Sequence, residues 1–118
     1  MLLIDDEPDI LRVLSRSLRS DGYDVLTAQS GEEGLDLFRK ELPGIVITDI
    51  KMPGIDGIDV LKAIKNEAPD VEVIIVTGHG DIDNAIEALK YGASDFINKP
   101  IRDEALSLAL SRAEEKIR

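Results

Sequence analysis

The strongest constraint on the fold is the alternation of short, continuous apolar runs with amphipathic stretches. Within 118 residues, runs rich in Val, Ile and Leu occur five times, near 1–5, 24–28, 45–49, 72–77 and 94–98. Because these runs are continuously apolar rather than alternating, they predict strands that are buried on both faces, as in parallel sheets. Strands that alternate with helices predict an α/β doubly wound sheet, and the absence of a linker or repeat predicts one domain over residues 1–118.

The amphipathic stretches predict helices, and several of them begin with residues typical of helix N-termini. These residues are Pro8, Ser30 with Glu33 as a capping box, Asp56, and Asp81 with Asp83. The last stretch carries an apolar stripe at helical spacing, made of Leu106, Leu110, Ala113 and Ile117.

Polar side chains follow four of the apolar runs. The first run is followed by Asp5 and Asp6, the third ends in Asp49, the fourth in Thr77, and the fifth is followed by Lys99. If the runs are parallel strands, their carboxyl ends lie along one edge of the sheet, where doubly wound folds bind their ligands. We therefore expect these five side chains to meet in one crevice.

The acidic residues at this edge predict a cation site. Asp5 and Asp6 alone are as typical of a solvated turn or helix N-cap as of a functional site, but Asp49 would bring a third carboxylate close to them. Such crowding is unfavourable unless protons or a cation neutralise it, and oxygen ligands suit Mg²⁺ or Mn²⁺. The Asp-Asp-Glu-Pro loop after the first run would repel phosphate, which argues against a flavin or nucleotide module.

The hydroxyl and ammonium groups complete a site for phosphoryl transfer. Transfer to or from a carboxylate spreads charge over three equatorial oxygens, which a cation, Thr77 and Lys99 could each contact. Taken singly, a Thr at a strand end and a Lys before Pro are ordinary residues. Their joint position at successive strand ends favours the functional interpretation.

Composition excludes several functions. The net charge of −10 argues against direct binding of this domain to nucleic acid or to an anionic membrane. The chain has no Cys, which excludes disulfides and thiolate chemistry. No apolar stretch approaches the length of a membrane span and no secretory signal opens the chain, so we expect a cytoplasmic protein.

These motifs resemble the receiver domain of two-component response regulators over essentially the whole chain. The matching segments are Leu3-Ile4-Asp5-Asp6-Glu7, Ile47 through Gly57, Val76-Thr77-Gly78 and Phe96-Ile97-Asn98-Lys99-Pro100. The resemblance implies a flavodoxin-like fold, with strand order 2-1-3-4-5 and five flanking helices.

The resemblance also implies roles for individual residues. Asp49 would be the phosphoacceptor, and Asp5, Asp6, Asp49 and the backbone carbonyl of Lys51 would hold Mg²⁺. Lys99 would contact the phosphoryl group.

Further positions correspond to the family's switch and to residues that modulate it. Thr77 would move to hydrogen-bond the phosphoryl group, and Phe96 would be the switch aromatic, which here lacks a hydroxyl. Lys51 and His79 would influence how long the phosphoryl group survives, and we expect His79→Ala to change the dephosphorylation rate more than folding. The resemblance also implies a cis peptide bond before Pro100.

The implied partners are a sensor histidine kinase or phosphotransfer domain, which donates the phosphoryl group, and a C-terminal output domain outside this chain. The segment 80–93 is most similar to receivers attached to transcription activators with an ATPase module. Receivers often pair through the face of the fourth and fifth helices, so a homodimer is an expected assembly. Two alternatives stay open: a small Mg²⁺-dependent phosphatase that uses Asp49 as a transient nucleophile, and a receiver-like interaction module that is never phosphorylated.

Overall fold

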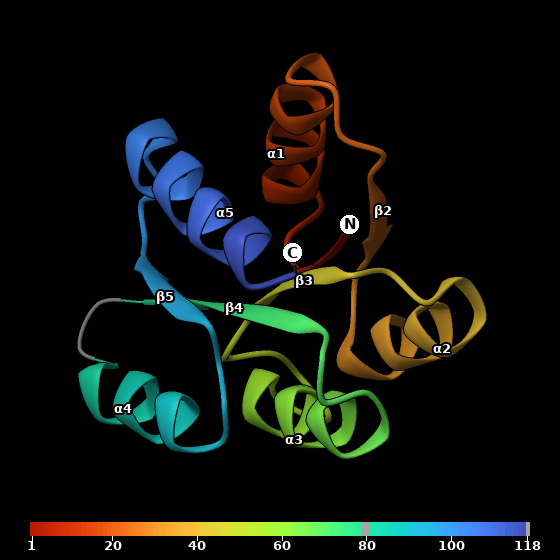
Figure 1. The fold of residues 1–118 in the computed structure, drawn as a ribbon, viewed down its shortest axis with the longest axis vertical. Coiled ribbons are helices and arrows are strands. Elements are labelled where there is room, and N and C mark those ends of the chain that lie inside the picture. The colour runs from red at the N-terminus through yellow and green to blue at the C-terminus, as the bar shows by residue number, and fades with distance from the viewer. Residues whose placement is uncertain (79–80, 118) are drawn as a thin grey trace.

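The computed structural model describes residues 1–78 and 81–117, and this part of the chain forms a five-stranded parallel sheet flanked by five helices (Figure 1). The strand order is β2-β1-β3-β4-β5, which confirms the predicted doubly wound topology. The strands are β1 (Leu2–Ile4), β2 (Leu26–Ala28), β3 (Ile45–Asp49), β4 (Glu72–Thr77) and β5 (Asp95–Asn98). The helices are α1 (Pro8–Ser20), α2 (Gly31–Glu41), α3 (Gly57–Glu67), α4 (Ile82–Lys90) and α5 (Asp103–Ile117).

The helices cover both faces of the sheet, α1 and α5 on one side and α2, α3 and α4 on the other (Figure 1). Successive residues of a strand point to opposite faces. Leu3 and Ile47 accordingly pack into the layer under α1 and α5, whereas Leu2 and Val46 pack into the layer under the other three helices. Two apolar layers on one sheet explain why the strand sequences are continuously apolar.

The register of the sheet aligns the carboxyl ends of the central strands. Ile4 pairs with Thr48, Asp49 with Val76, and Thr77 with Asn98. The polar residues at or just after these positions therefore lie along one edge.

Some local predictions need correction. The second strand begins at Leu26 rather than at residue 24, because it pairs only with the three-residue β1. The N–H of Glu33 donates to the Ser30 hydroxyl at 3.1 Å, but the Glu33 carboxylate accepts from Gln29 instead of Ser30, so that capping box is half-formed.

Two further details concern the helix ends. A complete capping box lies instead at the start of α3, between Asp56 and Asp59. Ile117, predicted on the buried stripe of the last helix, is 52% exposed. It lies at the end of α5 beside Gly44, which has no side chain to cover it. None of the described helices is long and apolar enough to cross a bilayer.

Candidate functional site

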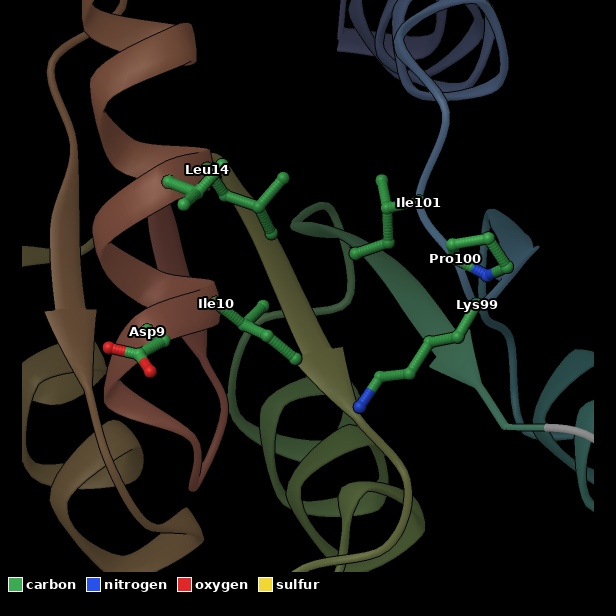
Figure 2. Close-up of a pocket in the computed structure, with 7 residues that line it drawn as sticks. Asp9, Ile10, Leu14, Lys99, Pro100 and Ile101 are labelled. Carbon is green, nitrogen blue, oxygen red and sulfur yellow. The ribbon is translucent and has the colours of Figure 1, made fainter.

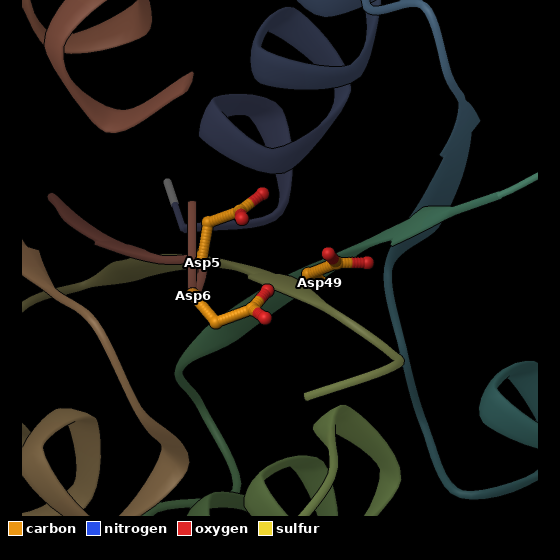
Figure 3. Close-up of side chains that lie close together, drawn as sticks. All are labelled: Asp5, Asp6 and Asp49. Carbon is orange, nitrogen blue, oxygen red and sulfur yellow. The ribbon is translucent and has the colours of Figure 1, made fainter. Parts of the chain in front are cut away.

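Three carboxylates cluster at the carboxyl edge of the sheet (Figure 3). Asp5 and Asp6 directly follow β1, Asp49 ends β3, and one oxygen of each lies within 4.8 Å of the others. Asp5 and Asp49 are 4% and 5% exposed, and Asp6 is half-buried. The fold therefore brings together acids that are more than forty residues apart in the sequence.

The donor chemistry of this cluster fits a hard divalent cation. Mg²⁺ binds oxygen ligands at about 2.1 Å, so two of its ligands are at most about 4.2 Å apart. The carboxylate oxygens need to approach one another only slightly to meet that limit. Lys51, whose backbone carbonyl is the fourth expected ligand, follows Asp49 by two residues in the loop after β3.

Lys99 supplies positive charge to the same cluster. It follows β5, and its Nζ lies 2.8 Å from Asp49 Oδ2, 3.6 Å from Asp5 Oδ2 and 3.8 Å from Glu7 Oε1. Burial by itself lowers the pKa of this ammonium, but the hydrogen bond to Asp49 and the charges of Asp49, Asp5 and Glu7 outweigh it and raise the pKa above its ordinary value. Lys99 therefore stays charged. The peptide bond between it and Pro100 is cis.

The surroundings of Asp5, unlike those of Lys99, disfavour the charged form of its side chain. Its burial raises the pKa of its carboxyl, and the nearby charges of Asp49 and Asp6 add to this. The N–H of Glu7, which donates to Asp5 Oδ1 at 2.9 Å, and the charge of Lys99 lower the pKa but only in part offset the rise. Burial and, to a smaller extent, the neighbouring acids disfavour the charged form of Asp5, and a bound cation would offset both effects.

The Thr77 hydroxyl is buried and turned toward β5. Its Oγ1 lies 2.8 Å from Asn98 Oδ1 and 3.4 Å from the carbonyl oxygen of Ile97. Phe96, two residues before Asn98, is half-buried and packs against the apolar layer on the α2, α3 and α4 side. The structure thus brings Asp5, Asp6, Asp49 and Lys99 together, while the Thr77 side chain contacts the neighbouring strand.

The Lys51 side chain turns toward α4. Its Nζ lies 2.9 Å from Asp81 Oδ1, and this ion pair is the main reason that the pKa of Asp81 is lowered. His79, expected to modulate the lifetime of the phosphoryl group, lies outside the described residues.

A glycine allows α3 to begin directly against the backbone of Asp49. A Cβ on Gly57 would lie 2.2 Å from the carbonyl oxygen of Asp49, and the Gly57 N–H donates to the carbonyl of Ile50 at 2.8 Å. Sequence reasoning assigned no site role to Gly57 or Asn98, and it took Asp81 only as the start of a helix. Asn98 directly precedes Lys99, and Asp81 lies two residues after His79. The close approach of Gly57 to Asp49 has no separate signal in the sequence.

An apolar pocket of about 340 Å³ borders the site (Figure 2). It is formed by α1 and by the segment after β5, and its lining includes Ile10, Val13, Leu14, Ile101 and the stem of Lys99. Figure 2 shows the Lys99 side chain extending from this pocket toward the end of β3. The site therefore has an apolar surface next to it on the α1 side.

The fold and the site together define a class: flavodoxin-like α/β proteins with an acidic, cation-compatible cluster at the carboxyl edge of the sheet. Residues 1–111 match the family model of the response regulator receiver domain. The chain therefore belongs to the receiver domains of two-component response regulators.

Individual relatives agree with this assignment. The chain is 40% identical to the transcriptional regulatory protein GlrR of Escherichia coli (strain K12), covering 98% of this chain and 26% of that protein. It is 42% identical to the C4-dicarboxylate transport transcriptional regulatory protein DctD of Rhizobium meliloti (strain 1021), covering 100% and 26%. The chain thus spans about a quarter of the length of these relatives.

A solved structure agrees as well. The crystal structure of a response regulator receiver domain protein from Clostridium thermocellum matches with a TM-score of 0.94 and 46% identity. The match covers 98% of this chain and 93% of that one.

Proposed function

We propose that residues 1–118 act as one phosphoacceptor domain, in which Asp49 takes a phosphoryl group from a phosphohistidine of a partner histidine kinase or phosphotransfer domain. The observation that carries this proposal is the position of the Lys99 ammonium, 2.8 Å from Asp49 Oδ2 beside two further aspartates. The proposal is supported by a carboxylate, two further acids that could hold a cation, and an ammonium group that lie together in one crevice.

In this proposal, an oxygen of Asp49 forms a bond to phosphorus while the phosphorus–nitrogen bond of the phosphohistidine breaks. The imidazole leaves as the neutral base when its other nitrogen carries a proton. Lys99 stays paired with the charge that accumulates on the phosphoryl oxygens. Hydrolysis later returns Asp49 to a carboxylate and releases inorganic phosphate.

Asp5, Asp6, Asp49 and the Lys51 carbonyl would hold Mg²⁺ or Mn²⁺. When bound, the cation supplies neutralisation of the carboxylates and of a phosphoryl oxygen. Asp5 is already oriented for this by the N–H of Glu7.

The proposed switch uses Thr77 and Phe96. Thr77 would leave Asn98 for a phosphoryl oxygen, and Phe96 would fill the space that Thr77 leaves. The outcome would be a changed face at α4 and β5 that an output domain or a second copy of the chain can recognise.

The wider context is also a proposal. The relatives are named as transcriptional regulators and are about four times as long as this chain, which supports a C-terminal output domain that the receiver controls. Because the receiver carries a net charge of −10, nucleic-acid binding would belong to that output domain. We infer a cytoplasmic location for the chain from its membership of the receiver family.

The test is labelling with acetyl phosphate in the presence of Mg²⁺, followed by mapping of the modified residue. We expect the wild-type chain to be labelled once, at Asp49. Asp49→Asn should keep the fold, as measured by circular dichroism, and lose the label. Persistent label in that variant would mean that the acceptor is wrong.

The same experiment separates the two alternatives. A phosphatase would turn over a generic phosphate ester many times, whereas a receiver is labelled stoichiometrically by a small phosphodonor. An interaction module would take no label at all.

A further inference from the structure

The ion pair between Lys51 and Asp81 joins the loop that follows Asp49 to the first turn of α4. The Lys51 side chain is 71% exposed, whereas the Asp81 side chain is only 8% exposed. The carboxylate is therefore fixed by its surroundings, while little packing holds the ammonium. It is the position of Asp81 that decides where the charge of Lys51 lies.

Asp81 occupies the N-cap position of α4 without acting as a cap. In α2 and α3, the N-cap side chains of Ser30 and Asp56 accept the backbone N–H three residues later, and both residues have extended backbones, with ψ of 162° and 179°. Asp81 has ψ of 28°, and its carboxylate makes no capping hydrogen bond. Asp is among the best N-cap residues. The backbone N–H groups at the start of α4 are therefore a second favourable partner for this carboxylate, and it does not use them.

In its present backbone conformation, the Asp81 carboxylate pairs with Lys51 and does not cap α4. A buried carboxylate needs compensating partners, and loss of the Lys51 ammonium would favour the N–H groups at the start of α4 in its place. Since capping requires the extended backbone seen at Ser30 and Asp56, a change of partner also moves the first turn of α4.

Lys51 in turn is within reach of a second anion. Two residues of backbone separate it from Asp49 by at most about 7 Å. A phosphoryl group on Asp49 would add negative charge there, and the exposed ammonium could exchange Asp81 for it.

We propose that Asp81 is a positioning residue for the phosphoryl chemistry at Asp49: it holds the Lys51 ammonium at α4 in the unphosphorylated chain, and gives it up when Asp49 gains the charge of a phosphoryl group. The Asp81 carboxylate is then free to cap α4. This inference rests on the proposed function, and it gives the phosphorylation site a direct connection to α4 beside the one through Thr77.

The experiment measures the affinity for beryllium fluoride, a phosphoryl mimic, in the presence of Mg²⁺ by calorimetry. Asp81→Asn removes the charge but keeps a good N-cap residue, so it should tighten binding by roughly two- to five-fold, the range expected for a partly exposed ion pair. Asp81→Ala also removes the cap and should tighten binding less. In a Lys51→Met background, which keeps the backbone carbonyl, Asp81→Asn should have no effect on affinity.

Glu67→Gln is the matched control. It breaks the ion pair between Arg39 and Glu67, with an N–O distance of 2.8 Å, between α2 and α3. It should leave the affinity unchanged, because this pair lies away from α4 and the acidic cluster.

Amide hydrogen exchange of Asp83 and Asn84 tests the capping step without relying on the folding of an Asp81 variant. Protection of these amides should increase when beryllium fluoride binds the wild-type chain, and also in Lys51→Met without the mimic. Unchanged protection in both cases, or an Asp81→Asn chain that binds no tighter than wild type, would overturn the inference and leave the proposed function intact. If the wild-type chain does not bind beryllium fluoride, both the inference and the proposed function are wrong.

Discussion

The charge of Lys99 is what allows Asp5 and Asp49 to lie buried side by side. Like charges a few ångströms apart raise the free energy of the folded state unless an opposite charge is near. The Lys99 ammonium meets Asp49 at 2.8 Å and Asp5 at 3.6 Å, and its side chain is 25% exposed. Lys99 and a bound cation would therefore both offset the repulsion between the buried carboxylates of Asp5 and Asp49.

We expect Lys99→Met to destabilise the chain without metal by about 1–3 kcal/mol, because two carboxylates lose their partner. Added Mg²⁺ should then stabilise the variant more than it stabilises the wild type. Urea unfolding with and without 10 mM Mg²⁺ measures both effects. At ten times its dissociation constant a ligand adds about 1.4 kcal/mol. Equal gains from Mg²⁺ in the two chains would argue against this shared role.

Tyr23 offers a prediction on pH. Its hydroxyl donates to the Glu114 carboxylate on α5, and chiefly for that reason its pKa is raised to about 12, with burial and the charges of Glu114 and Asp21 adding to the rise. Because the folded pKa lies above the ordinary value of about 10, the bond contributes fully to stability below pH 10. That contribution should disappear as the pH rises from about 10 to about 12.

Absorbance of tyrosinate against pH measures this directly. A Tyr91→Phe background leaves Tyr23 as the one tyrosine of the chain. Glu114→Gln should move the midpoint back toward the ordinary value. A midpoint that does not depend on Glu114 would assign the shift to burial instead.

At the scale of elements, the contact between α3 and β3 holds the loop after Asp49 in place. The start of α3 lies so close to the Asp49 carbonyl that a Cβ on Gly57 would overlap it at 2.2 Å. Both atoms belong to backbone, so a flexible side chain cannot relieve the overlap. The position of Asp49 therefore depends on a residue that has no side chain.

Gly57→Ala should destabilise the chain by about 1–3 kcal/mol, the range of overpacked cores, and lower the rate of labelling at Asp49. Thermal unfolding and acetyl phosphate labelling measure the two effects. Gly22→Ala is the control for loss of a glycine, since nothing lies within 4 Å of its Cβ position and only its φ of +97° is strained. It should reduce stability while the rate of labelling stays close to that of wild type.

For the whole molecule, we expect a protein phosphodonor to dock on the apolar pocket beside Lys99. Its lining comes from α1 and from the segment after β5, and Val13 in it is 61% exposed. A helix of a partner that covers this pocket could bring a phosphohistidine to the carboxyl edge of the sheet.

Val13→Glu should therefore lower kcat/KM for transfer from a histidine kinase that phosphorylates the wild-type chain by about tenfold, which corresponds to about 1.4 kcal/mol of lost contact. Labelling by acetyl phosphate should be unchanged, because the substitution lies outside the acidic cluster. Leu108→Glu, at a 52% exposed position of α5 that does not line this pocket, is the matched control. If Val13→Glu slowed phosphoryl transfer from both the kinase and acetyl phosphate, the pocket would affect the chemistry at Asp49 rather than docking of the kinase.

Much of this architecture could be predicted from the sequence because each strand and helix carries its own local pattern. The continuous apolar runs gave five strands within two residues of their observed limits, and the acids at their ends predicted an acidic edge. Asp81 shows where such prediction fails. Its sequence position is that of an N-cap, but the burial of its carboxylate and the presence of Lys51 gave it a different partner.

The sequence alone determined the doubly wound class and the set of residues at the carboxyl edge, because hydrophobic period and strand ends are local properties. Only the tertiary structure decided which of these residues touch: Lys99 on Asp49, Thr77 on Asn98, and Lys51 on Asp81. These contacts depend on burial and on competition between partners from distant segments. Neither can be predicted from one local segment of the sequence.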